Sequence, residues 1–254
     1  MGRRGARPDD DDRWVFNRLA QDYRSRPGYP PALVGRLAEL AGGRGAVVVD
    51  LGAGIGHLAL PLAARGLEVR AVEPARRMLE LLRSGGGDGR VEAVHATAEE
   101  TGLPDASAGA AILADALQWI DPDRAGREAA RVVAPGGLVA VVTARLSDGG
   151  FSRAISALLA EANHRARPRA PGRPAQFLHA AAVVRVEEQT FLHEEALSPP
   201  RLDAVLRSLS LVGPALGPDA VAGLLARARG LAEAHGGAVW ARVLTLRFGR
   251  RAGP

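Results

Sequence analysis

The chain of 254 residues contains no cysteine and no lysine, and all 33 of its basic side chains are arginines. Without cysteine the chain forms no disulfide, offers no thiolate nucleophile, and holds neither zinc nor an iron–sulfur cluster through cysteine. Without lysine, Schiff-base enzymes, P-loop NTPases and kinases that bind ATP through a lysine are excluded. Secreted proteins stabilised by disulfides are therefore excluded, and so are several large enzyme classes.

Aromatic residues are also scarce, at 4% of the chain, whereas apolar residues make up 47%. We therefore expect a core of alanine, valine and leucine, and the length suits one large domain. The formal net charge is +5 and the isoelectric point is about 10.9, which reflects arginine usage more than excess charge. Because no basic stripe is interleaved with aromatic residues, nucleic acid is not expected as a partner.

Long apolar runs are missing as well. Uncharged apolar runs such as residues 106–114 are much shorter than the roughly 20 residues that cross a membrane. The first residues are polar and charged, and they lack the apolar segment of a signal peptide. We therefore expect a cytoplasmic protein without membrane contact, in which residues 1–12 form a disordered tail.

Short apolar segments alternate with segments of helical periodicity through the first two thirds of the chain. The predicted strands are 46–51, 68–72, 91–95, 110–113 and 138–144, and the predicted helices are 14–23, 32–40, 56–64, 74–82 and 122–133. Such alternation predicts a parallel sheet that is covered by helices on both faces. After residue 145 the pattern predicts helices over 151–163, 198–211 and 218–235, strands over 187–192 and 239–248, and an irregular stretch over 165–174.

A glycine-rich turn, Asp50–Gly56, follows the first predicted strand. Glycines are needed where the backbone turns tightly and a ligand approaches without a Cβ atom between them. Glu73 ends the second strand, where an acid can accept hydrogen bonds from both ribose hydroxyls. His57 stands where the dinucleotide fingerprint has a glycine, and Asp50 would repel a pyrophosphate but not an ammonium or sulfonium group. The turn therefore favours a nucleoside with a cationic amino-acid tail.

This turn and several further segments together resemble the class I S-adenosylmethionine-dependent methyltransferases. The segments that carry the resemblance are 23–30, 50–56, 72–79, 97–104, 114–119 and 131–137. They are similar to the small-molecule branch, with methyltransferase type 11 and the trans-aconitate and malonyl-acceptor methyltransferases. The resemblance implies an α/β, Rossmann-like, doubly wound fold: a mostly parallel seven-stranded sheet, a helical N-terminal lid and a cap inserted after strand five.

On this basis we expect residues 13–254 to form a single methyltransferase domain. Its parts would be lid helices (13–45), a cofactor-binding core (46–145), a cap or substrate insertion (146–198), and C-terminal helices with the last strand (199–254). The expected cofactor is S-adenosylmethionine. The expected partner is a small-molecule substrate bound by a monomer or homodimer, and a hetero-partner is not excluded.

The resemblance implies a role for each cofactor-binding residue. The glycine turn approaches the methionine portion, Asp50 orients it, and Glu73 binds the ribose. The strand-four end lies near the sulfonium, and Tyr23 and Arg26 close over the site. The full set is Tyr23, Arg26, Asp50, Gly52, Ala53, Gly54, Gly56, Glu73, Pro74, Thr97, Ala98, Glu99, Ala114 and Asp115. The branch often has an acid in place of Thr97, so the adenine amino group is left to backbone atoms or to Glu99.

Methyl transfer from a sulfonium is an in-line displacement, so positioning supplies most of the catalysis and a base is needed only for a poor nucleophile. The candidate catalytic residues are Gln118, Asp115, His57 and His179. Each also has a purely structural interpretation: a support for the strand-four loop, a loop contact, a packed histidine, and a surface histidine. No histidine and carboxylate cluster has the spacing of metal ligands, so no metal is expected.

The arginines at 165, 167, 169 and 173 have two interpretations, a clamp for an anionic substrate or a solvated loop. The function that we expect is methyl transfer to a small-molecule acceptor, in specialised metabolism. One alternative is non-methylating chemistry, such as a cyclisation or elimination, on the same fold. The other is a catalytically silent methyltransferase-like subunit that supports a partner.

Overall fold

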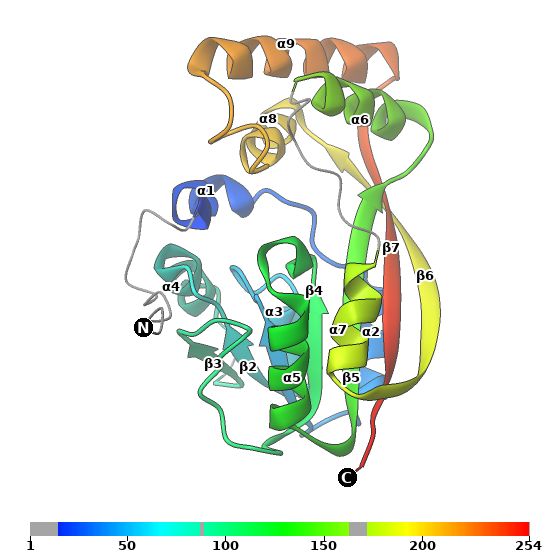
Figure 1. The fold of residues 1–254 in the computed structure, drawn as a ribbon. Coiled ribbons are helices and arrows are strands. Elements are labelled where there is room, and N and C mark those ends of the chain that lie inside the picture. The colour runs from blue at the N-terminus through cyan, green and yellow to red at the C-terminus, as the bar shows by residue number, and fades with distance from the viewer. Residues whose placement is uncertain (1–14, 87–88, 163–171, 254) are drawn as a thin grey trace, which may run out of the picture.

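The structure is a computed structural model that describes residues 15–86, 89–162 and 172–253. Within these residues, seven strands form one sheet in the order β3-β2-β1-β4-β5-β7-β6 (Figure 1). The strands are β1 (Val47–Leu51), β2 (Glu68–Val72), β3 (Val91–Val94), β4 (Ala108–Ala114), β5 (Val133–Leu146), β6 (Val183–Leu197) and β7 (Ala238–Arg251). The expected tail at 1–12 lies outside the described residues.

The sheet is parallel over its first five strands and antiparallel at one side. β1 pairs in parallel with β2 and β4, and β4 pairs in parallel with β5. β7 runs antiparallel between β5 and β6, so β6 forms an edge of the sheet. The predicted Rossmann-like, mostly parallel seven-stranded sheet is therefore confirmed.

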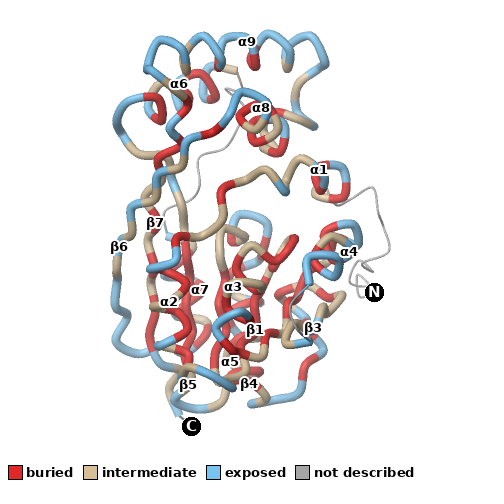
Figure 2. The backbone as a smooth tube through the Cα atoms, turned by 180° about the vertical axis from the view of Figure 1, so that it is seen from behind, coloured by how far each residue is buried: buried red, intermediate tan, exposed pale blue. Residues whose placement is uncertain are grey.

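Helices cover both faces of the sheet, as the near-continuous apolar strands require. α2 (Pro31–Leu40) and α3 (Ala59–Ala63) pack on one face through residues such as Leu33 and Leu62. α5 (Pro122–Val132) and α7 (Arg173–Ala180) pack on the other, where Phe177 is fully buried. Asp121 caps α5, because its carboxylate accepts hydrogen bonds from the backbone N–H groups of Asp123 and Arg124. Figure 2 shows that the buried residues, drawn in red along the backbone, are concentrated in these layers.

A separate apolar core lies at one end of the molecule, where α6 (Gly150–Ala162), α8 (Pro199–Arg207) and α9 (Pro218–Ala234) come together (Figure 1). Trp240 of β7 is buried in this core beside Leu158 and Leu206. These three helices are called the cap below. α1 (Val15–Tyr23) lies between the cap and α4 (Arg76–Ser84), and it contacts both α4 and α8.

Local structure departs from the sequence pattern at three places. α3 begins only at Ala59, because the glycine turn continues through Gly56, which has a φ of +90°. α7 begins at Arg173, inside the stretch predicted to be irregular, and β6 is longer than the predicted strand at both ends. The 146–198 segment adds α6 to the cap, whereas its α7 packs on α5 and its β6 joins the sheet. The domain boundaries themselves stay a prediction.

Within the part of the chain that the structure describes, no helix combines the length and the apolar character that crossing a membrane requires.

Candidate active site

The glycine turn lies where β1 ends and turns toward α3. Gly52 and Gly54 have φ values of +75° and +57°, a region that favours glycine. A Cβ atom on Gly52 would lie 2.6 Å from the Cβ atom of Ala116, so a larger residue would displace the strand-four loop. The backbone N–H groups of Gly52 and Ala53 both donate to the carbonyl oxygen of Val72. These bonds hold the turn against the end of β2.

Glu73 connects the end of β2 to this turn. One carboxylate oxygen accepts from the Gly54 N–H at 2.9 Å, and the other accepts from the Ala75 N–H at 2.8 Å. The side chain is only 6% exposed, and burial raises its pKa to about 7. Each oxygen keeps a lone pair after these bonds, so the carboxylate can also accept from the hydroxyls of a sugar.

Asp50 lies behind the turn and is 2% exposed. Burial and, to a smaller extent, the nearby Glu73 carboxylate raise its pKa to about 7, against the opposing effect of a hydrogen bond from the Ala59 backbone. Its Oδ2 atom is buried without a hydrogen-bond partner among the described residues. Asp50 therefore ties β1 to the start of α3 and leaves one acceptor unused.

A cavity opens along the glycine turn, and we call it the cofactor cavity. Its lining includes ten of the fourteen residues that the sequence assigns to the cofactor: Tyr23, Gly52, Gly54, Glu73, Pro74, Thr97, Ala98, Glu99, Ala114 and Asp115. The other four lie elsewhere. Asp50 is behind the turn, Ala53 and Gly56 pack against the core, and Arg26 lines a neighbouring cavity.

Five further residues line the cofactor cavity that the sequence did not assign to it: Phe16, Met78, Ala116, Trp119 and Ile120. Phe16 of α1 meets Trp119 edge to face, with ring centroids 5.1 Å apart. It meets Tyr23 in the same manner at 6.1 Å. The apolar face of α1 is the sequence signal for this aromatic wall, but only the tertiary contact shows what that face covers.

The loop after β4 holds Asp115 in a left-handed conformation, with a φ of +53°. Its Oδ1 atom accepts a hydrogen bond from the backbone N–H of Ala144 at 2.8 Å, which links the loop to β5. Gln118 donates from Nε2 to the carbonyl oxygen of Asp115 at 2.9 Å. Both side chains thus support the loop, and both also line a neighbouring cavity.

This second cavity adjoins the first, because Tyr23 and Asp115 line both. We call it the acceptor cavity, and its lining comes from α1, β5, α6, α8 and β7. His57 stacks on the Tyr23 ring, with centroids 5.6 Å apart. Burial and the nearby arginines, Arg26 first among them, lower the pKa of His57 to about 4. The imidazole is therefore neutral at ordinary pH and accepts a proton weakly.

The remaining sequence candidates lie away from these cavities. His179 is exposed near the end of α7 and lines neither of them. Arg173 donates to the carbonyl oxygens of Leu117 and Ile120, so it supports the strand-four loop. The arginines at 165, 167 and 169 lie outside the described residues. Across the described ranges, no three histidine or carboxylate side chains gather as a metal site.

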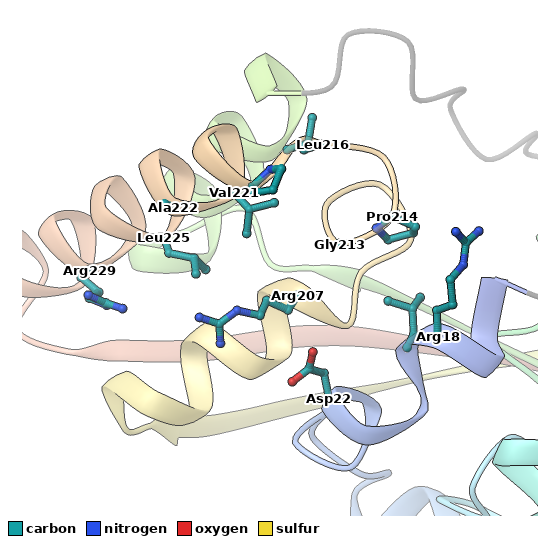
Figure 3. Close-up of a pocket in the computed structure, with 12 residues that line it drawn as sticks. Arg18, Asp22, Arg207, Gly213, Pro214, Leu216, Val221, Ala222, Leu225 and Arg229 are labelled. Atoms are coloured by element: carbon teal, nitrogen blue, oxygen red, sulfur yellow. The ribbon is translucent and has the colours of Figure 1, made fainter.

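A third hollow lies where α1 meets the cap (Figure 3). Arg18 and Asp22 of α1 and Arg207 of α8 line it, and Val221 and Leu225 of α9 form an apolar side. Among the described residues, it shares none of its lining with the cofactor or acceptor cavity.

Comparison with known proteins now adds to this geometry. A family model described as a methyltransferase domain matches residues 49–141. A methyltransferase structure from Anaeromyxobacter dehalogenans superposes with a TM-score of 0.65 and 27% identity, covering 90% of this chain and 99% of that one. Residues 49–141 therefore form a methyltransferase domain, in agreement with the resemblance to the class I S-adenosylmethionine-dependent methyltransferases. The matched segment contains the glycine turn, Glu73 and the strand-four loop.

Two further proteins are similar to this chain, one in sequence and one in fold. An uncharacterized methyltransferase of Mycobacterium tuberculosis is 44% identical over 119 residues, which is 47% of either chain, so this chain spans about half of that relative. The fold also matches a phosphoethanolamine N-methyltransferase of Haemonchus contortus in complex with S-adenosylhomocysteine. That TM-score is 0.60 at 16% identity, covering 98% of this chain and 61% of that one.

The residues present fit S-adenosylmethionine. Glu73 offers carboxylate oxygens to the ribose hydroxyls, and the Thr97–Glu99 segment with Met78 lines the same cavity, where it could border the adenine. The unpartnered Asp50 oxygen is an acceptor behind the turn, which suits the ammonium group of a methionine tail better than a phosphate.

Proposed function

We propose that this chain transfers a methyl group from S-adenosylmethionine to a small-molecule acceptor held in the acceptor cavity. The observation that carries the proposal is the adjacency of the two cavities, which share Tyr23 and Asp115. A donor beside the glycine turn and an acceptor on the other side of these residues would meet at this boundary. A place in specialised metabolism stays a prediction from the sequence.

When bound, S-adenosylmethionine supplies a methyl group that is already activated on a sulfonium. The residues of the chain would supply position: Glu73 would bind the ribose, and the Asp115 loop would border the methyl-bearing end. Tyr23, Trp119 and Phe16 form an aromatic wall of the cavity. Holding two reactants in line in this way is worth effective molarities of about 10⁵–10⁸ M.

Proton removal has a small part in this proposal. His57 is the imidazole nearest the shared boundary, and its pKa of about 4 makes it a weak base. Asp115 is held by the Ala144 N–H and supports its own loop. We therefore infer an acceptor that is nucleophilic without a base, in the protonation state in which it binds.

The test is isothermal titration of the chain with S-adenosylmethionine and S-adenosylhomocysteine. Gly54→Asp should abolish binding, because it places a second carboxylate beside Glu73. The matched control is Gly136→Asp, at another glycine of positive φ with open space around it, which should bind like the wild type. Absence of binding by the wild-type chain would refute the cofactor assignment.

A second measurement separates catalysis from binding alone. Formation of S-adenosylhomocysteine is followed by mass spectrometry with pools of small metabolites and, separately, with RNA. Turnover with a metabolite pool supports the proposal, whereas turnover with RNA alone overturns the small-molecule acceptor. Cofactor binding without turnover on any pool would favour the silent-subunit alternative.

A further inference from the structure

Arg242 of β7 reaches into the acceptor cavity with part of its guanidinium unused. Its Nη2 atom donates to the carbonyl oxygen of Gly28 and lies 2.9 Å from Nδ1 of His193. Its Nε atom is buried and has no hydrogen-bond partner among the described residues. A buried N–H group without an acceptor costs free energy, so this atom marks a place where a ligand oxygen would be stabilising.

The surrounding charge is positive. Arg26 lines the same cavity, with its guanidinium carbon 4.1 Å from the centre of the Tyr23 ring, and it donates to the Ser208 hydroxyl and carbonyl, which are neutral. Arg145 also lines the cavity but pairs with Asp148. Among the described residues, Asp115 is the single carboxylate in the lining, and one of its oxygens accepts from the Ala144 N–H.

Burial shifts the pKa values of three groups that line this cavity. Burial lowers the pKa of Arg242, and burial with Arg26 and Arg242 lowers the pKa of His57. Burial also raises the pKa of Tyr29, so its hydroxyl in the cavity wall keeps its proton and can donate. An anion in the cavity would balance the arginine charge and accept from both Arg242 and Tyr29.

Much of the remaining lining is apolar. It includes Leu159 of α6, Leu209 and Leu211 after α8, and Trp240 of β7. The cavity thus combines cationic donors with a hydrocarbon surface.

We propose that the acceptor cavity selects a small carboxylate whose anionic group binds the Nε atom of Arg242 and the Tyr29 hydroxyl, with an apolar body against the cap. This inference rests on the proposed function, because it names the class of acceptor. The donors and the apolar residues line the same cavity, so the two features select together for an amphipathic acid.

The experiment titrates the full chain, with S-adenosylhomocysteine bound, against butanoate, hexanoate, octanoate and phenylacetate, and against the primary amide of each. Trp240 reports binding by its fluorescence, and a Trp240→Phe variant identifies its share of the signal. We expect at least one carboxylate to bind about tenfold or more tightly than its amide, since charge-assisted hydrogen bonds carry that discrimination.

Arg242→Gln should reduce that carboxylate preference to less than about threefold, while affinity for S-adenosylhomocysteine is unchanged. The matched control is Arg250→Gln, at an exposed arginine of the same strand, which should keep the full preference. If Arg242→Gln does not unfold cooperatively, Tyr29→Phe replaces it. That variant should weaken carboxylate binding severalfold and leave amide binding unchanged.

Three results would overturn the inference: no carboxylate of the series binds in the millimolar range, amides bind as tightly as acids, or the variants keep the preference. The titrations are repeated without S-adenosylhomocysteine. If the chain binds carboxylates through Arg242 but not the cofactor, the methyl-transfer proposal fails while the oxyanion site stands. If the reverse holds, only the acceptor class is refuted.

Discussion

The cofactor cavity takes its lining from residues 52–120, with Phe16 and Tyr23 added from α1, whereas the acceptor cavity draws on segments from Tyr23 to Arg242. The first is made by loops at the ends of adjacent parallel strands, which follow one another in the chain. The second is made where the lid, the cap and an antiparallel strand meet. Local sequence therefore specifies the donor site, and long-range packing specifies the acceptor site.

The largest expected difference between the two cavities is produced by a substitution at Glu73. Glu73→Ala removes the carboxylate that accepts from Gly54 and Ala75, and with it the ribose acceptor. We expect affinity for S-adenosylhomocysteine to fall by about 100-fold or more, since each hydrogen bond to a charged group is worth about 1.5–3 kcal/mol. Carboxylate binding in the acceptor cavity should be unchanged. Titration of both ligands measures this.

The matched control for that prediction is Glu68→Ala, at the opposite end of β2, where the side chain pairs with Arg90. It should leave both affinities as they are in the wild type. Equal loss of cofactor and carboxylate binding in Glu73→Ala would show that the two cavities are not independent.

The next largest effect on ligand affinity is expected at Tyr23, which lines both cavities. Tyr23→Ala removes the ring that lines both cavities and stacks on His57. We expect the dissociation constants for both ligands to rise about tenfold, because a buried aromatic contact is worth about 1–2 kcal/mol. Gln21→Ala, on the exposed side of α1, is the control. A change in one affinity alone would contradict the shared boundary.

The buried acids of the cofactor site predict a pH dependence of stability. Folded Asp50 and Glu73 hold protons up to about pH 7, far above the range in which unfolded carboxyls release them. The folded chain thus binds more protons between about pH 4 and pH 7, so the free energy of unfolding falls as the pH rises through this window. Two shifts of this size, at about 1.4 kcal/mol for each pKa unit, should lower it by several kcal/mol, measured by urea unfolding without cofactor.

The Asp50→Asn and Glu73→Gln double variant should flatten this slope, whereas Glu80→Gln, on the exposed side of α4, should not. Stability that rises over this pH window in the wild type, or an unchanged slope in the double variant, would show that these carboxyls ionise normally in the folded chain.

The smallest effect is expected at His57. With a pKa of about 4 the ring is neutral at ordinary pH, so His57→Asn should change kcat by less than about threefold and leave the pH–rate profile unaltered above about pH 5. A general base would instead cost about 10²–10⁴-fold on removal. Initial rates of S-adenosylhomocysteine formation across this pH range distinguish the two roles.

Much of the donor site could be predicted because strand ends and glycine spacing are local signals. The turn at Gly52 and Gly54, the acid at Glu73 and the Asp115 loop all lie within a few residues of a predicted strand end. Phe16, Met78 and Trp119 were not predicted there, because their apolar character is equally typical of core residues. The histidines show the same limit: the sequence treats His57 and His179 alike, but only His57 lies beside the cavities.

By itself, the sequence determined that the chain forms a mostly parallel sheet, and it determined the cofactor side of the site. Apolar strand patterns and glycine turns encode these features within short segments. Only the tertiary structure decided the acceptor side. In the sequence, nothing distinguishes Arg242 from other arginines near the C-terminus. Its buried Nε atom becomes a candidate ligand site because Gly28 and Tyr29, more than two hundred residues earlier, lie beside it in the fold. The apolar residues of the cap come from α6 and from the segment after α8, so charge and apolar surface meet there through packing.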